Sequence, residues 1–477
     1  MVYVTGTDKA WMINMAAGRT DEVVVAIRRK MAARVLNAGD RLPSIRGFAA
    51  AMKVSPSTVV EAYDRLAAEG VIRSRPGSGF YVSGALPPLA LAEAAARPDR
   101  AIDPFWVSRQ SLDAGPDMLK PGCGWLPADW MPHEALRRSM RSLARAEDAV
   151  LAEYGSTRGP LALRRLLVRQ LAGQGIEAGA EQIMLTSSGT QAIDLICRYL
   201  LQPGDTVLVD DPCYFNFQAL LHAHRAKLVS VPYTPVGPDP AAFAEALATH
   251  QPRLYITNAA LHNPTGATIS PQVAHKLLNA AAAHNLTIVE DEIFADFEPE
   301  PSPRLAALDG LSRVIRIGSF SKTLSASIRC GYIAARADWI EELIDLQVAT
   351  NFGGVSPIAA ELVYGVLSDG SYRKHLDGLR RRLAKARQDA VPKLARLGIE
   401  PWLMPRGGFY LWCRLPEGVD AASVARNALR EDVVLAPGNV FSLSQSSTGF
   451  MRFNVAQMPG QRVYDILSKA LAGQGDA

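Results

Sequence analysis

Hydrophobic residues near the start of the chain recur at every fourth position. Between Glu22 and Leu36 they occupy Val23, Ile27, Met31 and Val35. Residues four apart lie on the same side of an α-helix, so this spacing predicts a helix with one apolar face.

Two more helices and a hairpin are predicted directly after this helix. Ser44 is placed to cap a second helix that runs through Ala51. After the turn Val54-Ser55-Pro56, a third helix is predicted over Ser57–Glu69, where Gly70 ends it. Residues 71–73 and 80–82 predict two short strands around a glycine-rich tip at 75–79. Residues 19–83 are therefore predicted to form a small module of three helices followed by a hairpin.

The pattern changes further along the chain. Residues 84–117 are rich in Ala and Pro and predict a linker with room for one short helix. Residues 118–477 alternate short apolar runs with longer amphipathic stretches, which predicts an α/β domain with a mostly parallel sheet covered by helices. The strands expected are Gln182–Thr186, Thr206–Asp210, Leu254–Thr257, Thr287–Glu290 and Val314–Ile317. Such sheets bind ligands at the carboxyl ends of their strands.

Charge separates the same two parts. The net charge is +4, and residues 19–83 hold 11 Lys or Arg and 6 Asp or Glu, which is +5 and leaves about −1 elsewhere. A basic module beside a near-neutral body indicates a polyanionic partner for the module alone. A solvated helical surface of similar charge is the ordinary alternative.

Several classes of protein are excluded. No apolar run approaches the ~18 residues of a membrane span, and the first residues lack the pattern of a secretory signal. The five cysteines are scattered without a CxxC pair, which argues against a disulfide framework and against a zinc site. The sequence therefore predicts a cytoplasmic protein with reduced thiols, no metal and no membrane partner.

The stretch GDRLPSIRGFAAAMKVSPSTVVEAYDRLAAEGVIRSRPGSGFYV resembles the winged helix-turn-helix domain of the GntR family of bacterial regulators along its whole length. The resemblance implies binding to double-stranded operator DNA, with the third helix in the major groove. The candidate DNA contacts are Arg41, Ser44, Arg46, Ser55, Ser57, Thr58, Arg73 and Arg75. Relatives place arginine in the first turns of that helix, where this chain has Pro56 and Val60, so base readout is expected to depend on Arg46, Ser57 and Thr58.

The stretch SFSKTLSASIRCGY resembles the Schiff-base segment of class I aminotransferases, which are fold-type I enzymes with pyridoxal 5'-phosphate (PLP) as cofactor. Their fold is a mostly parallel sheet with a smaller C-terminal α/β lobe. The resemblance implies that Lys322 forms the Schiff base with PLP. A lysine suits this role because partial desolvation keeps its amine nucleophilic.

Other family motifs appear in the expected order. A helix start at Ser188, Gly189, Thr190 and Gln191 would bind the PLP phosphate through backbone N–H groups and the helix dipole. By resemblance, the phosphate is also contacted by Ser319, by Arg329 and by Tyr154, which reaches it from the partner subunit. The ring is contacted within one chain by Asn263 at its hydroxyl, Asp291 at the pyridine nitrogen and Tyr214 stacked on its face. Arg452 matches the arginine that binds a substrate carboxylate through two parallel hydrogen bonds.

One family position differs. The tyrosine usual three residues after the aspartate is Phe294. The cofactor's ring hydroxyl would lose one donor, which places efficient turnover in question. His222, His224 and His262 have no metal-like partners nearby in the sequence and are interpreted as structural.

Together the two modules resemble the MocR subfamily of GntR-type regulators over about residues 19–457. That resemblance implies a homodimer with its sites at the subunit interface, and a regulator that senses an amino compound through external aldimine formation at Lys322. The alternatives are a working aminotransferase with a secondary DNA-binding module, and a DNA-binding protein in which PLP is only structural. The sequence does not identify the effector, the target genes or the DNA half-sites, and it does not distinguish activation from repression or a sensor from an enzyme that turns over. Pocket segments such as Trp125-Leu126 and Asn351-Phe352-Gly353 have no predictable position.

Overall fold

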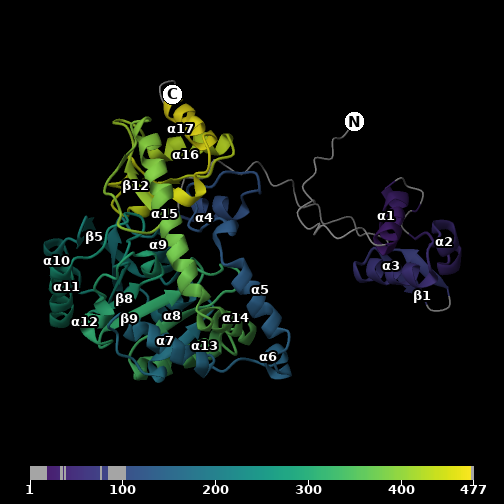
Figure 1. The fold of residues 1–477 in the computed structure, drawn as a ribbon, viewed down its shortest axis with the longest axis horizontal. Helices are drawn as coiled ribbons and strands as arrows, with labels where there is room; N and C mark the ends of the chain where they lie inside the picture. The colour runs from purple at the N-terminus through teal and green to yellow at the C-terminus, as the bar shows by residue number, and fades with distance from the viewer. Residues whose placement is uncertain (1–18, 33–35, 37–38, 76–77, 84–103, 474–477) are drawn as a thin grey trace. The chain divides into compact units, whose positions relative to one another are not determined.

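The computed structural model describes residues 19–32, 36, 39–75, 78–83 and 104–473. The chain divides into two compact units, Met1–Arg100 and Ala101–Ala477 (Figure 1). Each unit has a hydrophobic core of its own. Within the described residues no helix is long and apolar enough to cross a membrane.

The first unit has the predicted order of three helices and a hairpin. Its elements are α1 (Arg19–Ala32), α2 (Ile45–Met52), α3 (Pro56–Ala68), β1 (Ile72–Arg75) and β2 (Gly79–Val82). The bounds differ from the sequence expectation by up to four residues; residues 33–35 and the hairpin tip 76–77 lie outside the described part. The apolar faces of the three helices meet in one core that includes Val23, Ile27, Val59, Tyr63 and Leu66.

The second unit is built on an eight-stranded sheet. Its strand order is β3-β10-β9-β8-β7-β4-β5-β6, and β10 runs antiparallel between β3 and β9. All five strands predicted from the apolar runs are present, with bounds shifted by at most two residues. The strands are β3 (Ile183–Thr186), β4 (Thr206–Asp211), β5 (Lys227–Thr234), β6 (Gly237–Pro238), β7 (Leu254–Thr257), β8 (Thr287–Asp291), β9 (Val314–Ser319) and β10 (Gly331–Ala334).

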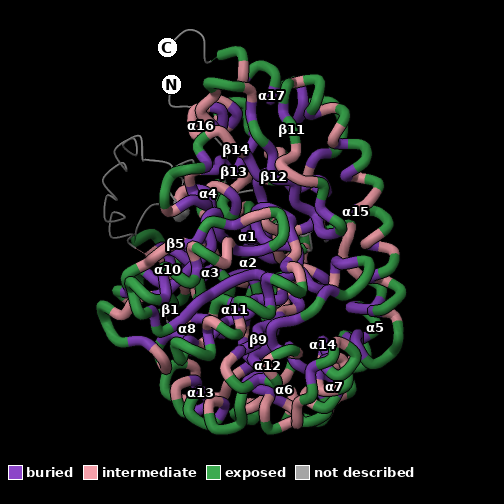
Figure 2. Tube along the Cα trace, turned by 90° about the vertical axis from the view of Figure 1, so that its left-hand side faces the viewer, coloured by how far each residue is buried: buried purple, intermediate pink, exposed green. Residues whose placement is uncertain are grey.

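Helices cover both faces of this sheet, and the strands form the buried centre of the tube drawing (Figure 2). One face packs against α7 (Leu161–Ala172), α10 (Pro240–His250), α11 (Pro271–Ala283), α12 (Leu305–Asp309) and α14 (Pro357–Ser368). The other packs against α8 (Gly189–Leu200), α9 (Phe215–Ala223) and α13 (Ala337–Thr350). The short or peripheral elements are η1 (Ala128–Trp130), α5 (His133–Leu143), α6 (Asp148–Ala152), η2 (Ala180–Gln182) and η3 (Ala295–Phe297).

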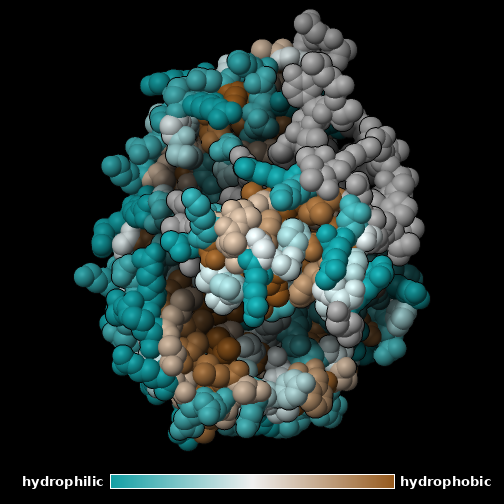
Figure 3. Space-filling view, turned by 90° about the vertical axis from the view of Figure 1, so that its right-hand side faces the viewer, coloured by the Kyte–Doolittle hydropathy of each residue, from teal (hydrophilic) through white to brown (hydrophobic). Residues whose placement is uncertain are grey.

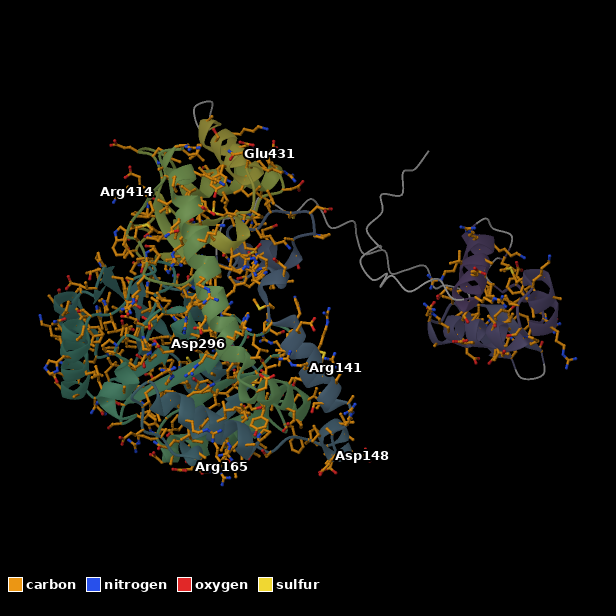
Figure 4. All side chains as sticks on the ribbon, in the orientation of Figure 1. Arg141, Asp148, Arg165, Asp296, Arg414 and Glu431 are labelled. Carbon is orange, nitrogen blue, oxygen red and sulfur yellow. The ribbon has the colours of Figure 1, made fainter. Side chains whose placement is uncertain are left out.

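A smaller C-terminal lobe carries an antiparallel sheet of order β11-β12-β14-β13. The long helix α15 runs along both lobes (Figure 1). It is tied to the end of the large sheet by Tyr372, whose hydroxyl donates to Asp296 at 2.8 Å, and by Arg380, which donates to the Asp296 carbonyl at 3.0 Å; Figure 4 labels Asp296. The elements are α15 (Ser371–Ala395), β11 (Glu400–Pro401), β12 (Tyr410–Arg414), α16 (Ala421–Arg430), β13 (Ala436–Pro437), η4 (Gly438–Phe441), β14 (Phe450–Asn454), η5 (Val455–Gln457) and α17 (Arg462–Ala472).

The structure describes the stretch 84–117, where the sequence predicted a linker with room for one short helix, only from residue 104. Its second half contains α4 (Pro104–Asp113), which packs against α9 and η4. Val107 of α4 is buried in the core of the C-terminal lobe. Residues 104–117 therefore belong to the second unit, whereas residues 84–103 lie outside the described part.

Candidate functional site

The carboxyl ends of the large sheet's strands open into a cavity of about 400 Å³. Ten residues that the sequence singled out line it: Ser188, Gly189, Thr190, Tyr214, Asn263, Asp291, Ser319, Lys322, Arg329 and Arg452. They come from both lobes and from segments up to 264 residues apart. The topology brings them together because parallel strands end at one edge of the sheet.

Lys322 lies in the loop that joins β9 to β10. Its Nζ donates a hydrogen bond to the Gly124 carbonyl at 2.6 Å. Burial, and then the positive charge of Arg452, lower the pKa of the amine to about 8, while Asp291 acts in the opposite direction. At pH 7 a pKa of about 8 leaves roughly a tenth of this amine neutral and nucleophilic, far more than for an ordinary lysine.

Asp291 is the last residue of β8 and is buried. Burial raises the pKa of its carboxyl to about 6, although the Ile293 N–H donates to Oδ1 at 3.2 Å and favours the charged form. The Asn258 side chain donates to the Asp291 carbonyl at 2.8 Å and fixes this end of the strand. A buried carboxylate of this kind is stabilised by a cation placed beside it.

The N-terminus of α8 forms another wall. Ser188 is its N-cap, and its Oγ accepts from the Gln191 N–H at 3.0 Å. Thus the start of a twelve-residue helix faces the cavity, a position that favours an anion. Gln191 does not line the cavity: its Oε1 accepts from the backbone N–H and the hydroxyl of Ser187 at 2.6 and 2.8 Å. Its side chain shapes the turn.

Arg452 projects from β14 and is only 1% exposed. Its two terminal nitrogens donate to Asn263 Oδ1 and to the Gly122 carbonyl, each at 2.8 Å. The guanidinium lies 4.2 Å from the ring centre of Tyr410 and 4.8 Å from that of Phe441. These contacts hold a fork of donors in a water-poor setting, which suits recognition of a carboxylate.

Several lining residues were not anticipated from the sequence. Gly122 and Gly124 supply the carbonyls that Arg452 and Lys322 bind. A Cβ atom at Gly124 would stand 3.2 Å from the Tyr410 hydroxyl and 3.9 Å from Lys322 Nζ, so glycine leaves this space open. Ser108, Ser111 and Leu112 of α4 also line the cavity, as do Phe215 and Tyr410. The two glycines of the stretch Lys-Pro-Gly-Cys-Gly were the one available signal.

Phe294 lies at the cavity wall and is buried. Its ring packs 5.4 Å from Tyr410 and 5.6 Å from Phe409, centre to centre. Phe294 therefore joins the aromatic packing under the cavity and offers no hydroxyl to a ligand. Burial raises the pKa of the Tyr410 phenol, which keeps that hydroxyl protonated.

Tyr154 and the segment 351–353 do not line this cavity. The rings of Tyr154 and Phe352 meet edge to face at 5.1 Å, and the two residues are 76% and 69% exposed. Of the pocket segments whose position the sequence left open, Trp125 lines the cavity and residues 351–353 do not.

In the first unit, the candidate DNA-contact residues fall into two groups. Ser44 and Ser55 are the N-caps of α2 and α3, and their hydroxyls accept from the backbone N–H groups of Gly47 and Thr58. The Ser55 hydroxyl also lies 2.8 Å from those of Ser57 and Thr58. These contacts set the direction of the helix starts.

The four arginines predicted to contact DNA are exposed: Arg41, Arg46, Arg73 and Arg75. Arg75 stacks over the ring of Tyr81 at 4.6 Å, and the Tyr81 hydroxyl lies 2.6 Å from that of Ser78. Arg41 packs beside Gly79 of the hairpin. Thus three of the four cations stand on or against the hairpin, and Arg46 stands on α2.

Comparisons with known proteins match both units. The family model "Aminotransferase class I and II" matches residues 127–469, and "Bacterial regulatory proteins, gntR family" matches residues 19–82. The chain is 31% identical to the uncharacterized HTH-type transcriptional regulator YdcR of Escherichia coli, over 91% of this chain and 94% of that one. It is 28% identical to the HTH-type transcriptional regulator NorG of Staphylococcus aureus, over 85% and 94%.

Solved structures match the second unit. LysN of Thermus thermophilus, an alpha-aminoadipate aminotransferase complexed with N-(5'-phosphopyridoxyl)-L-leucine, matches with a TM-score of 0.70 and 25% identity, over 77% of this chain and 94% of that one. A kynurenine aminotransferase of Pyrococcus horikoshii matches with a TM-score of 0.71 and 23% identity, over 80% and 96%.

Proposed function

Because the chain belongs to the MocR subfamily of GntR-type transcription regulators, in which a gntR-family domain is joined to a class I and II aminotransferase domain, we propose that its second unit senses a small amino compound and thereby controls the DNA binding of the first. One observation carries the proposal. The partly buried amine of Lys322 and the buried guanidinium of Arg452 line a single cavity in a chain that also has a gntR-family domain.

The cofactor of the second unit is pyridoxal 5'-phosphate. The residues present fit it: an amine at Lys322, a buried carboxylate at Asp291 for a protonated ring nitrogen, and a helix start at Ser188 with the hydroxyl of Ser319 and the cation of Arg329 for a phosphate. When bound, PLP supplies a covalent link to amines and an electron sink. Tyr214 would pack against the ring and Asn263 would donate to its hydroxyl.

Within this proposal, the effector is a primary amine that carries a carboxylate. Only a primary amine can take the place of the Lys322 amine on the cofactor's carbonyl carbon. The fork of Arg452 matches a carboxylate and gains little from a neutral group. Arg452 is already held by Asn263 and Gly122, so little further ordering is needed on binding.

A homodimer completes the proposed sensor. Tyr154 and Phe352 are large aromatic side chains exposed as a pair. Figure 3 shows apolar surface on the side of the second unit where α5 and α6 lie, and Met140 of α5 and Leu151 of α6 are about half exposed. Apolar surface of this kind is typical of a protein interface. We assign it to a second copy of the chain, whose cavity Tyr154 would enter at the phosphate end.

The second candidate function is an aminotransferase. It is favoured by the same cavity, since the low-pKa amine of Lys322 can move a proton and Arg452 can orient a substrate. Phe294 favours the sensor, because a tyrosine donor to the cofactor's ring hydroxyl is missing there. The third candidate is a DNA-binding protein in which PLP has only a structural role.

One experiment separates the three. The purified, PLP-loaded protein is mixed with a panel of amino acids and simple amines, while the cofactor absorbance spectrum, affinity for a selected operator and keto-acid release are measured together. The sensor predicts a spectral change and a DNA-affinity change at the same amine concentration, with keto acid formed far below enzyme-like rates. Keto acid at enzyme-like rates with constant DNA affinity would establish the aminotransferase. No response to any amine would leave the structural role.

A further inference from the structure

The outward face of α3 begins with uncharged side chains, and the exposed acidic residues Glu61 and Asp64 follow them. Val59, Ala62, Tyr63 and Leu66 are buried against the core of the first unit. The side chains that point away from this core are therefore set by the helical period, and they begin with Pro56, Ser57 and Val60. Val60 is 39% exposed, which makes it one of two large aliphatic side chains at the surface of the described part of this unit.

The one cation of α3 is turned away from this region. Arg65 donates to Asp21 of α1 at 2.7 Å and lies 3.6 Å from Glu69. Glu61 accepts from the Thr20 hydroxyl of α1 at 3.1 Å. Glu61, in the middle of α3, and Arg65, in its second half, are thus tied to α1 by polar and ionic contacts. Pro56, Ser57 and Val60 precede them at the surface.

The cations of the unit stand on other elements. Arg46 lies on α2 and Arg73 on β1, and both are exposed. Exposed arginines of this kind can bind phosphates, which fix the position of a protein on DNA, or guanine edges, which specify sequence. The helix start that reaches the bases then presents a methyl-bearing side chain and a hydroxyl.

We propose that Val60 selects thymine, by packing against the C5-methyl group in the major groove, with the Ser57 hydroxyl as its polar neighbour. The methyl group of thymine is the apolar group that base edges display in the major groove. An exposed valine buries apolar surface there and gains nothing from the polar edges of guanine or cytosine. The inference rests on the proposed operator binding, and it names the base that this helix requires.

The test uses the full chain and removes one methyl group at a time. A bound sequence is first selected from random double-stranded DNA, and each dT in it is then replaced by deoxyuridine, which differs only in lacking the methyl. At one dT in each half-site, deoxyuridine should weaken binding of the wild type about three- to fivefold, the value of one buried methyl-sized group. For Val60→Ala, the same replacement should have almost no further effect, because the partner of the methyl is already absent.

Matched controls identify the contact. Val25 on α1 is a similarly exposed valine, 45% against 39%, so Val25→Ala should keep the full deoxyuridine effect. Val60→Arg should shift the selected sequence toward guanine at that position. The Tm of each variant checks that the unit folds.

The outcomes are distinct. If Val60→Ala weakens binding to dT and deoxyuridine sites equally, or if no dT position shows coupling to Val60, the inference is wrong while operator binding stands. If selection with the wild type yields no bound sequence, the proposed function itself fails.

Discussion

Replacing Arg452 tests how the protein recognises the carboxylate of its effector. Arg452→Ala removes both terminal nitrogens from a buried site and leaves a bound carboxylate without its partner. That loss costs ~2–4 kcal/mol, so the effector concentration for half of the spectral change should rise roughly 30- to 1000-fold. Affinity for DNA without effector should stay nearly constant, because the residue lies in the other compact unit.

The same replacement has a cost for folding that the assay must separate from binding. Asn263 Oδ1 and the Gly122 carbonyl lose their donors, and a buried acceptor without a donor costs ~1–3 kcal/mol. The Tm should therefore fall. Arg452→Lys keeps a cation but offers a single point of charge in place of a fork; it should bind effector with an affinity between those of the wild type and the alanine variant.

The assay follows the absorbance spectrum and DNA anisotropy in one titration of each variant. Arg414 offers a matched control, since it lies on the neighbouring strand β12, is exposed, and stacks on the ring of Phe450 at 5.0 Å (Figure 4). Arg414→Ala should respond like the wild type. The reasoning is refuted if Arg452→Ala responds at wild-type concentrations, or if an amine without a carboxylate acts as well as its amino acid.

Further predictions concern the cofactor, the DNA and the dimer. The cofactor-free protein should capture added PLP faster as the pH rises through about 8, because burial lowers the pKa of the Lys322 amine and only the neutral amine attacks the aldehyde. Borohydride added after capture should fix PLP on Lys322; an adduct elsewhere or a flat pH profile of capture argues against this. Asp291→Asn should lower the pH midpoint of PLP capture, because the negative charge that raises the pKa of the Lys322 amine is lost. It should also weaken PLP retention, measured by dialysis, because the cofactor ring loses the carboxylate that faces it. If the first unit contacts ~4–6 phosphates, the slope of log K for DNA binding against log salt concentration should be roughly −4 to −5; a salt-independent affinity contradicts DNA binding by this unit. Arg46→Ala should weaken DNA binding by on the order of 1–3 kcal/mol if Arg46 reads a base. Phe352→Asp should shift light scattering from dimer toward monomer, whereas Val236→Asp, at another exposed site, should not.

The sequence predicted the elements whose signal is local. Ser44 and Ser55 precede helices and cap them, and the apolar runs over β4, β7 and β8 are buried strands. The family motifs placed ten residues that do share one cavity. Their order along the chain could be recognised because each lies in a short stretch of distinctive residues.

The sequence could not show contacts made at long range. The partners of Lys322 and Arg452 are backbone carbonyls at Gly124 and Gly122, and any residue type has a carbonyl. Helix α4 looked like linker because Ala and Pro dominate the residues before it, and only packing against α9 reveals Val107 as core. Gln191 matched a phosphate-binding motif, yet its side chain bonds to Ser187, a choice of rotamer that sequence does not encode.

The antiparallel strand β10 has a consequence for how the chain is made. Strand β10 lies between β3 and β9 in the sheet, and its pairing partner β3 precedes it by roughly 145 residues in the sequence. The part of the sheet next to Ser188 therefore cannot form until Ala334 has been synthesised. The first unit is complete at Val82, roughly 250 residues earlier, and domains fold in order as they emerge at ~5–20 residues per second. For tens of seconds each nascent chain therefore bears a finished DNA-binding unit without a finished cavity. A product truncated in this interval would keep the gntR-family unit and lack the cavity in which Lys322 and Arg452 meet.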